Sequence, residues 1–68
     1  MPISARNQLS GKVTGLTLGA VMAEVTVDVG GQEIVAAITR ESVQKLGIQE
    51  NSTVSVVIKA TDVMLSTD

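Results

Sequence analysis

The chain has 68 residues and a formal net charge of −2; 44% of its residues are hydrophobic, and none is cysteine, histidine or aromatic. Such a length predicts one domain, 1–68, whose core alone supplies no more than a few kcal/mol. The composition excludes disulfides, the common zinc sites, and thiol or imidazole catalysis, so we do not expect an enzyme. Acidic charge and missing aromatic platforms argue against nucleic-acid binding.

Location and assembly follow from the same composition. No apolar run approaches the roughly 18 residues of a membrane span, and no signal-type segment is present. We therefore expect a cytoplasmic protein without a membrane partner. Since neither a disulfide nor zinc can reinforce the small core, we expect a homo-oligomer.

The first half of the chain predicts a strand and a hairpin. Residues 9–18 form a strand with Gly11 and Gly15 inside it, which indicates bends or a close approach of backbones. A turn follows at 19–20. Apolar and polar residues then alternate over 23–29, with the period of two that is typical of a half-buried strand.

Gly30-Gly31 predicts a two-residue hairpin turn into a return strand over 32–39. This strand is apolar on both faces. One face carries Ile34, Ala36 and Ile38, and the other carries Val35 and Ala37. We therefore expect both of its faces to be covered, the second by a partner subunit.

The second half begins with a short helix over 40–46, capped by Thr39 and ended by Gly47 in the left-handed conformation. A strand over 53–59 follows, with Val57 on the face opposite its other apolar residues. A loop at 60–62 then leads to a last strand over 63–66. The predicted fold is all-β: a small five-stranded OB-like barrel with one short helix between the third and fourth strands.

Three segments carry a family resemblance, in order along the chain: SARNQ at 4–8, AITRESV at 37–43 and VIKATDV at 57–63. They resemble the molbindins, small Mop-type proteins that bind molybdate or tungstate. The resemblance implies a single Mop domain that stores these oxyanions in the cytoplasm for molybdenum homeostasis. It also implies a hexamer, a trimer of dimers, with the oxyanion bound between subunits and no free metal cation.

The resemblance also implies which residues bind the oxyanion. The start of the helix and the segment around Ser4 contribute from different chains, together with the Lys59 side chain and the Ala60 amide. The implied oxyanion-binding set is Ser4, Ala5, Arg6, Thr39, Ser42, Lys59 and Ala60. A second oxyanion site is implied at the backbone of Gly19, Ala20 and Val21.

The residues taken alone leave simpler interpretations open. Ser4 and Arg6 suit a solvated segment, Thr39 and Ser42 suit ordinary helix capping, and Lys59 suits a solvated strand end. Residues 19–21 suit a plain hairpin turn. Three cations lack motif support and are interpreted as solvated surface charges: Lys12, Arg40 and Lys45.

Two other functions remain as alternatives. One is a ligand-dependent regulatory or purely structural oligomerisation module that acts on a separate partner protein. The other is an OB module for oligonucleotides or sugars, which the negative charge and missing aromatic residues disfavour.

Overall fold

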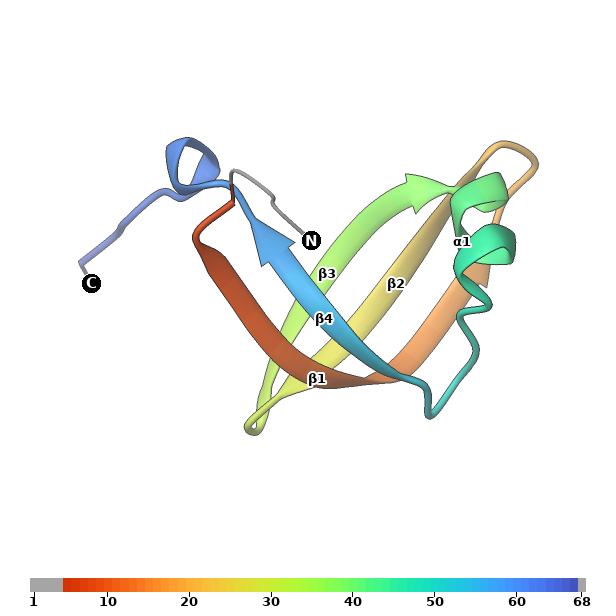
Figure 1. The fold of residues 1–68 in the computed structure, drawn as a ribbon, viewed down its shortest axis with the longest axis horizontal. Helices are drawn as coiled ribbons and strands as arrows, with labels where there is room; N and C mark the ends of the chain where they lie inside the picture. The colour runs from red at the N-terminus through yellow and green to blue at the C-terminus, as the bar shows by residue number, and fades with distance from the viewer. Residues whose placement is uncertain (1–4, 68) are drawn as a thin grey trace.

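The computed structural model describes residues 5–67. They form one antiparallel sheet with strand order β3-β2-β1-β4, and a helix at one end of it (Figure 1). The elements in chain order are β1 (Asn7–Leu18), β2 (Met22–Val29), β3 (Gln32–Thr39), α1 (Arg40–Leu46), β4 (Thr53–Ile58) and the 3-10 turn η1 (Ala60–Asp62).

Local sequence signals place the hairpin and the helix as predicted. Gly30 and Gly31 both have positive φ, at 58° and 89°, and they join β2 to β3 in the expected register. Thr39 caps α1, and Gly47 ends it with φ 66°. These predictions are confirmed because each depends on a backbone conformation that one or two residues determine.

Strand β1 is long and curved, and it pairs with two neighbours. Its first half pairs with β4 and its second half with β2, with a register shift between Val13 and Gly15. Near the change of partner, a Cβ on Gly11 would lie 2.5 Å from Val27 Cγ1 and 2.7 Å from the Asp28 carbonyl oxygen. The predicted close approach at Gly11 is therefore confirmed, and it requires a residue without a side chain.

The buried core is small and contains no large side chain. It consists of Val13, Ala23, Val25, Val27 and Val43. Alternate residues of β2 supply most of it, and Val43 brings the helix onto the sheet. The alternation predicted over 23–29 therefore does mark the core face, as a period of two requires.

The predicted fifth strand is wrong, and the five-stranded OB-like barrel is not confirmed. Within residues 5–67 the sheet has four strands and does not close, and 63–66 is not a strand. Two side chains of this segment are almost fully exposed, Met64 at 92% and Leu65 at 94%. Residues 60–62, predicted as a loop, form η1 instead.

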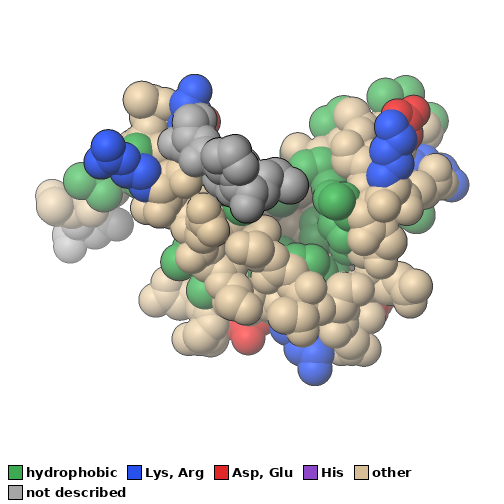
Figure 2. All heavy atoms as spheres, viewed as in Figure 1, with side chains coloured by type: hydrophobic (Ala, Val, Ile, Leu, Met, Phe, Trp, Pro, Cys, Tyr) green, Lys and Arg blue, Asp and Glu red, His purple; other side chains and the backbone are tan. Residues whose placement is uncertain are grey.

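The second faces of the edge strands carry exposed apolar side chains in the described part of the chain. Val35 on β3 is 59% exposed and Val57 on β4 is 47% exposed. Figure 2 shows further hydrophobic side chains gathered in the hollow between the two ends of the molecule. Cover by a partner subunit thus stays a prediction. No helix within residues 5–67 has the length and apolarity that a membrane crossing requires.

Candidate functional site

The first group of candidate residues lies where β3 becomes α1. Thr39 keeps an extended backbone, and its Oγ1 accepts a hydrogen bond from the Ser42 backbone N–H at 3.1 Å. The same hydroxyl donates to Ser42 Oγ at 2.7 Å. The predicted cap is confirmed. Ser42 Oγ accepts one bond and keeps its own hydrogen, which is a donor available to a ligand.

The turn between β1 and β2 is held against this group by Arg40. The Arg40 backbone N–H donates to the Val21 carbonyl oxygen at 2.8 Å. Its guanidinium Nη1 donates to the Gly19 carbonyl oxygen at 3.2 Å. Interpreting Arg40 as a merely solvated charge was therefore incomplete. The register of the β2–β3 hairpin could have predicted this contact. Because Met22 pairs with Thr39, Arg40 lies beside Val21.

A hollow of about 400 Å³ joins the helix start to the turn. Its lining comes from both segments and consists of Ala20, Val21, Thr39, Arg40, Glu41 and Gln44. The carboxylate in this lining, Glu41, is paired with Lys45 at 3.2 Å along the helix. The structure therefore brings part of the implied second site, at 19–21, next to Thr39 of the first.

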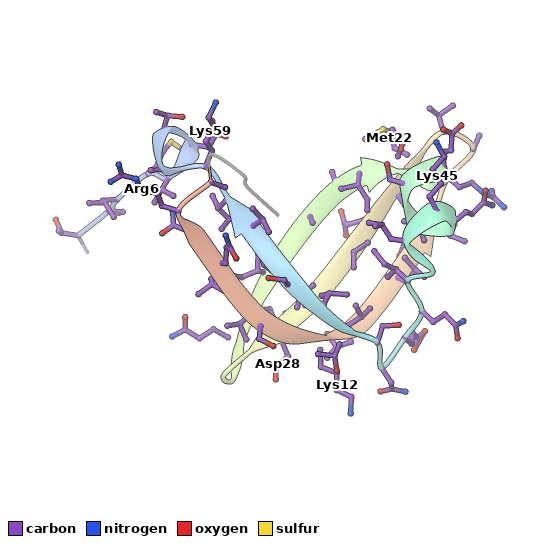
Figure 3. The ribbon with its side chains drawn as sticks, viewed as in Figure 1. Arg6, Lys12, Met22, Asp28, Lys45 and Lys59 are labelled. Atoms are coloured by element: carbon purple, nitrogen blue, oxygen red, sulfur yellow. The ribbon has the colours of Figure 1, made fainter. Side chains whose placement is uncertain are left out.

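The second group lies where β1 and β4 meet at their other ends. The last ladder pair is Asn7 with Ile58, and Asn7 Nδ2 also donates to the Ile58 carbonyl oxygen at 3.1 Å. Arg6 and Lys59 are the next residues on the two strands, so they flank the same end of the ladder. Figure 3 shows both cations at this end of the molecule.

Residues beside these cations complete the second group. Lys59 keeps an extended backbone and precedes η1, where its carbonyl oxygen accepts from the Asp62 N–H at 2.9 Å. Ala60 begins η1, and its side chain is exposed. Ala5 is half-buried. Ser4, the remaining member of the implied set, lies outside the described residues.

One chain does not bring the two groups together. Arg6 and Lys59 lie at one end of the sheet, while α1, marked by Lys45, lies at the opposite end (Figure 3). The first group supplies hydroxyl donors, and the second supplies two exposed cations. An anion in contact with both groups therefore needs residues from two chains.

The donor chemistry of both groups suits an anion. Guanidinium, ammonium and hydroxyl groups donate hydrogen bonds, and the first two carry positive charge. Within residues 5–67, no cluster of three or more acidic, histidine or cysteine side chains could hold a metal ion. The arrangement is therefore suited to oxygen atoms of a small oxyanion.

Comparison with known proteins agrees with this chemistry. The TOBE domain model matches residues 3–65. The chain belongs to the TOBE-domain family. It is 50% identical over 66 residues to molybdenum-pterin-binding protein 1 of Clostridium pasteurianum, which covers 96% of this chain and 97% of the relative. The resemblance to Mop-type proteins is thereby confirmed.

Two solved structures show the same fold in relatives of this TOBE domain. A molybdate-binding protein from Sporomusa ovata superposes with a TM-score of 0.94 at 39% identity, covering 98% of this chain and all of the other. The cytoplasmic molybdate-binding protein ModG, solved with molybdate bound, has a TM-score of 0.84 at 46% identity. That match covers 88% of this chain and 43% of ModG.

Proposed function

We propose that this protein binds molybdate or tungstate at sites shared between subunits of a homo-oligomer. One observation carries the proposal: a chain whose relatives include molybdate-binding proteins keeps Arg6 and Lys59 at the end of its sheet opposite the helix that begins after Thr39. Association of two chains end to end would bring the two groups into contact. The site would then exist only in the assembly.

The mechanism of binding is non-covalent. A tetrahedral dianion exchanges its water for Arg6 and Lys59 of one chain and the hydroxyls of Thr39 and Ser42 of another. Each charge-assisted hydrogen bond contributes roughly 1.5–3 kcal/mol, which offsets the loss of hydration. The segment at Ser4 and Ala5 and the Ala60 amide complete the donor set. The turn at 19–21 supplies a second site from its backbone.

Assembly as a hexamer, a trimer of dimers, is part of the same proposal. The buried core holds only small side chains, while Met64, Leu65 and Val35 are exposed on the surface of one chain. Within residues 5–67, both edges of the sheet also lack a neighbouring strand. Each feature favours a partner copy, because exposed apolar side chains and free strand edges are buried or paired by association.

The ligand in this proposal is the free oxyanion rather than molybdenum held on a pterin. A pterin ring is planar and needs stacking partners, and this chain has no aromatic residue to supply one. The exposed cations and hydroxyls instead match the oxygens of a small dianion. Selectivity over sulfate, which has the same charge and shape, would come from the size of the cage.

In the cell, we propose a store for the oxyanion in the cytoplasm, without catalytic activity. Exchange of ligand through non-covalent contacts makes such a store reversible. Because the ligand joins chains, its binding would also stabilise the assembly by mass action. A regulatory or purely structural module is the alternative, and it differs in needing a separate partner protein.

Native mass spectrometry with molybdate, tungstate and sulfate tests the proposal. We expect a hexamer that gains several molybdate or tungstate masses and none of sulfate at equal concentration. A hexamer without bound anion would favour the structural alternative. A folded monomer that binds molybdate would contradict the shared site.

A further inference from the structure

Three carbonyl oxygens in and beside the turn between β1 and β2 accept hydrogen bonds. Arg40 engages two of them, the Gly19 oxygen through Nη1 at 3.2 Å and the Val21 oxygen through its backbone N–H at 2.8 Å. The Met22 oxygen accepts from the Gly19 N–H at 2.8 Å. A single residue, Arg40, therefore satisfies two acceptors of one turn from the neighbouring element.

The donors of the same turn are left available. Within residues 5–67, the backbone N–H groups of Ala20 and Val21 form no hydrogen bond with a protein acceptor. Both residues are exposed, and both line the hollow that Arg40 also lines. Exposed N–H groups without a protein acceptor favour an anion, because its oxygen atoms can accept hydrogen bonds from them.

The charges around the hollow also favour an anion. Arg40 brings a permanent positive charge to its wall. Glu41 is the acidic residue of the lining, and its carboxylate is paired with Lys45 at 3.2 Å. Among residues 5–67, no carboxylate forms an ion pair with Arg40, while the Glu41 carboxylate is paired with Lys45.

We propose that Arg40 is a positioning residue for an oxyanion bound at the turn formed by Gly19, Ala20 and Val21. The guanidinium holds the Gly19 carbonyl oxygen, fixes the turn and keeps the Ala20 and Val21 N–H groups directed at the ligand. This inference rests on the proposed function, since it names a residue that one of its two sites requires. Arg40 acts through the turn, and neither the helix cap nor the cations at the other end of the sheet depend on it.

The first arm of the test needs no ligand. Amide hydrogen exchange is measured by NMR on the assembled protein and on Arg40→Gln, with Lys12→Gln as the control. Lys12 is exposed on β1, and its substitution changes the net charge equally. We expect exchange of the Gly19 N–H to accelerate at least tenfold in Arg40→Gln and to stay unchanged in the control. Unchanged Gly19 exchange in Arg40→Gln would overturn the positioning role.

The second arm is a molybdate titration followed at individual backbone amides. In Arg40→Gln we expect the molybdate concentration that gives half of the signal change at the Ala20 and Val21 amides to rise at least tenfold. The corresponding concentration at the Ser42 amide should change less than twofold. Arg40→Lys should recover part of the loss, because an ammonium can donate to Gly19 without the fixed geometry of a guanidinium. Lys12→Gln should titrate as the wild type does.

The outcomes separate this inference from the proposed function. Wild-type shifts at Ser42 without shifts at Ala20 and Val21 would overturn the inference and leave molybdate binding intact. Equal weakening at Ser42 and at the turn in Arg40→Gln would also overturn it. No shift anywhere in the wild type would overturn the proposed function itself, while the exchange of Gly19 would still decide whether Arg40 holds the turn.

Discussion

Thr39 and Ser42 are joined by two hydrogen bonds through a single hydroxyl. Thr39 Oγ1 accepts from the Ser42 N–H at 3.1 Å and donates to Ser42 Oγ at 2.7 Å. The pair therefore fixes the start of α1 and also orients the Ser42 hydroxyl. The same two residues serve stability and the proposed site, so a substitution can separate the roles only if it changes one bond at a time.

We predict that Thr39→Val destabilises the protein and weakens molybdate binding, whereas Thr39→Ser preserves both. Valine has nearly the shape of threonine but cannot cap the helix, a loss of about 1 kcal/mol. Thermal unfolding monitored by circular dichroism gives the stability, and calorimetric titration gives the affinity. If Thr39→Val bound molybdate as the wild type does, the threonine would be a cap and nothing more.

Gly11 tests the packing of β1 against β2. We predict that Gly11→Ala lowers stability by about 1–3 kcal/mol, since its Cβ would overlap Val27 and the Asp28 backbone and force the strands apart. Gly15→Ala is the matched control. Its Cβ would lie 3.5 Å from Thr26, an ordinary contact. Equal thermal midpoints for the two variants would show that the approach at Gly11 does not limit the packing.

Elements with local signals could be predicted from the sequence alone. The hairpin follows from two glycines and the helix from a cap and a terminator, all within a few residues of the structure they determine. The fifth strand could not be predicted correctly, because the apolar residues at 63–65 follow the turn η1 without forming a strand, and their sequence does not show whether a ladder partner lies beside them. Apolar alternation reports which residues avoid water, and it does not report which chain covers them.

The candidate site also has features that local sequence predicts and features that depend on the whole sheet. The role of Thr39 as a cap was predictable because its partner is three residues away. The bond from Arg40 to Gly19 joins residues 21 positions apart, and only the register of the hairpin brings them together. The separation of Arg6 and Lys59 from Thr39 is a property of the whole sheet, which no single motif contains.

The exposed end of the chain offers a test of assembly. Met64 and Leu65 are 92% and 94% exposed in one chain, an arrangement that favours burial against another copy. We predict that Leu65→Glu shifts the protein toward smaller species, because burying the added charge opposes association. Sedimentation velocity across a dilution series measures this shift.

Thr67→Glu is the control for that experiment, since it adds the same charge nearby at an exposed polar position. It should sediment as the wild type does. Unchanged sedimentation of Leu65→Glu would place the subunit interface elsewhere on the sheet, for example at Val35.

Lys59 provides the sharpest test of the shared site. We predict that Lys59→Ala weakens molybdate binding at least tenfold and leaves the thermal midpoint of the ligand-free protein nearly unchanged. The side chain is exposed, so its removal creates no cavity, while the ligand loses a charge-assisted hydrogen bond of roughly 1.5–3 kcal/mol. Lys12→Ala removes the same charge from an exposed position on β1 and should bind molybdate normally. Calorimetric titration of both variants distinguishes a local contact from a general effect of net charge, and equal affinities would remove Lys59 from the site.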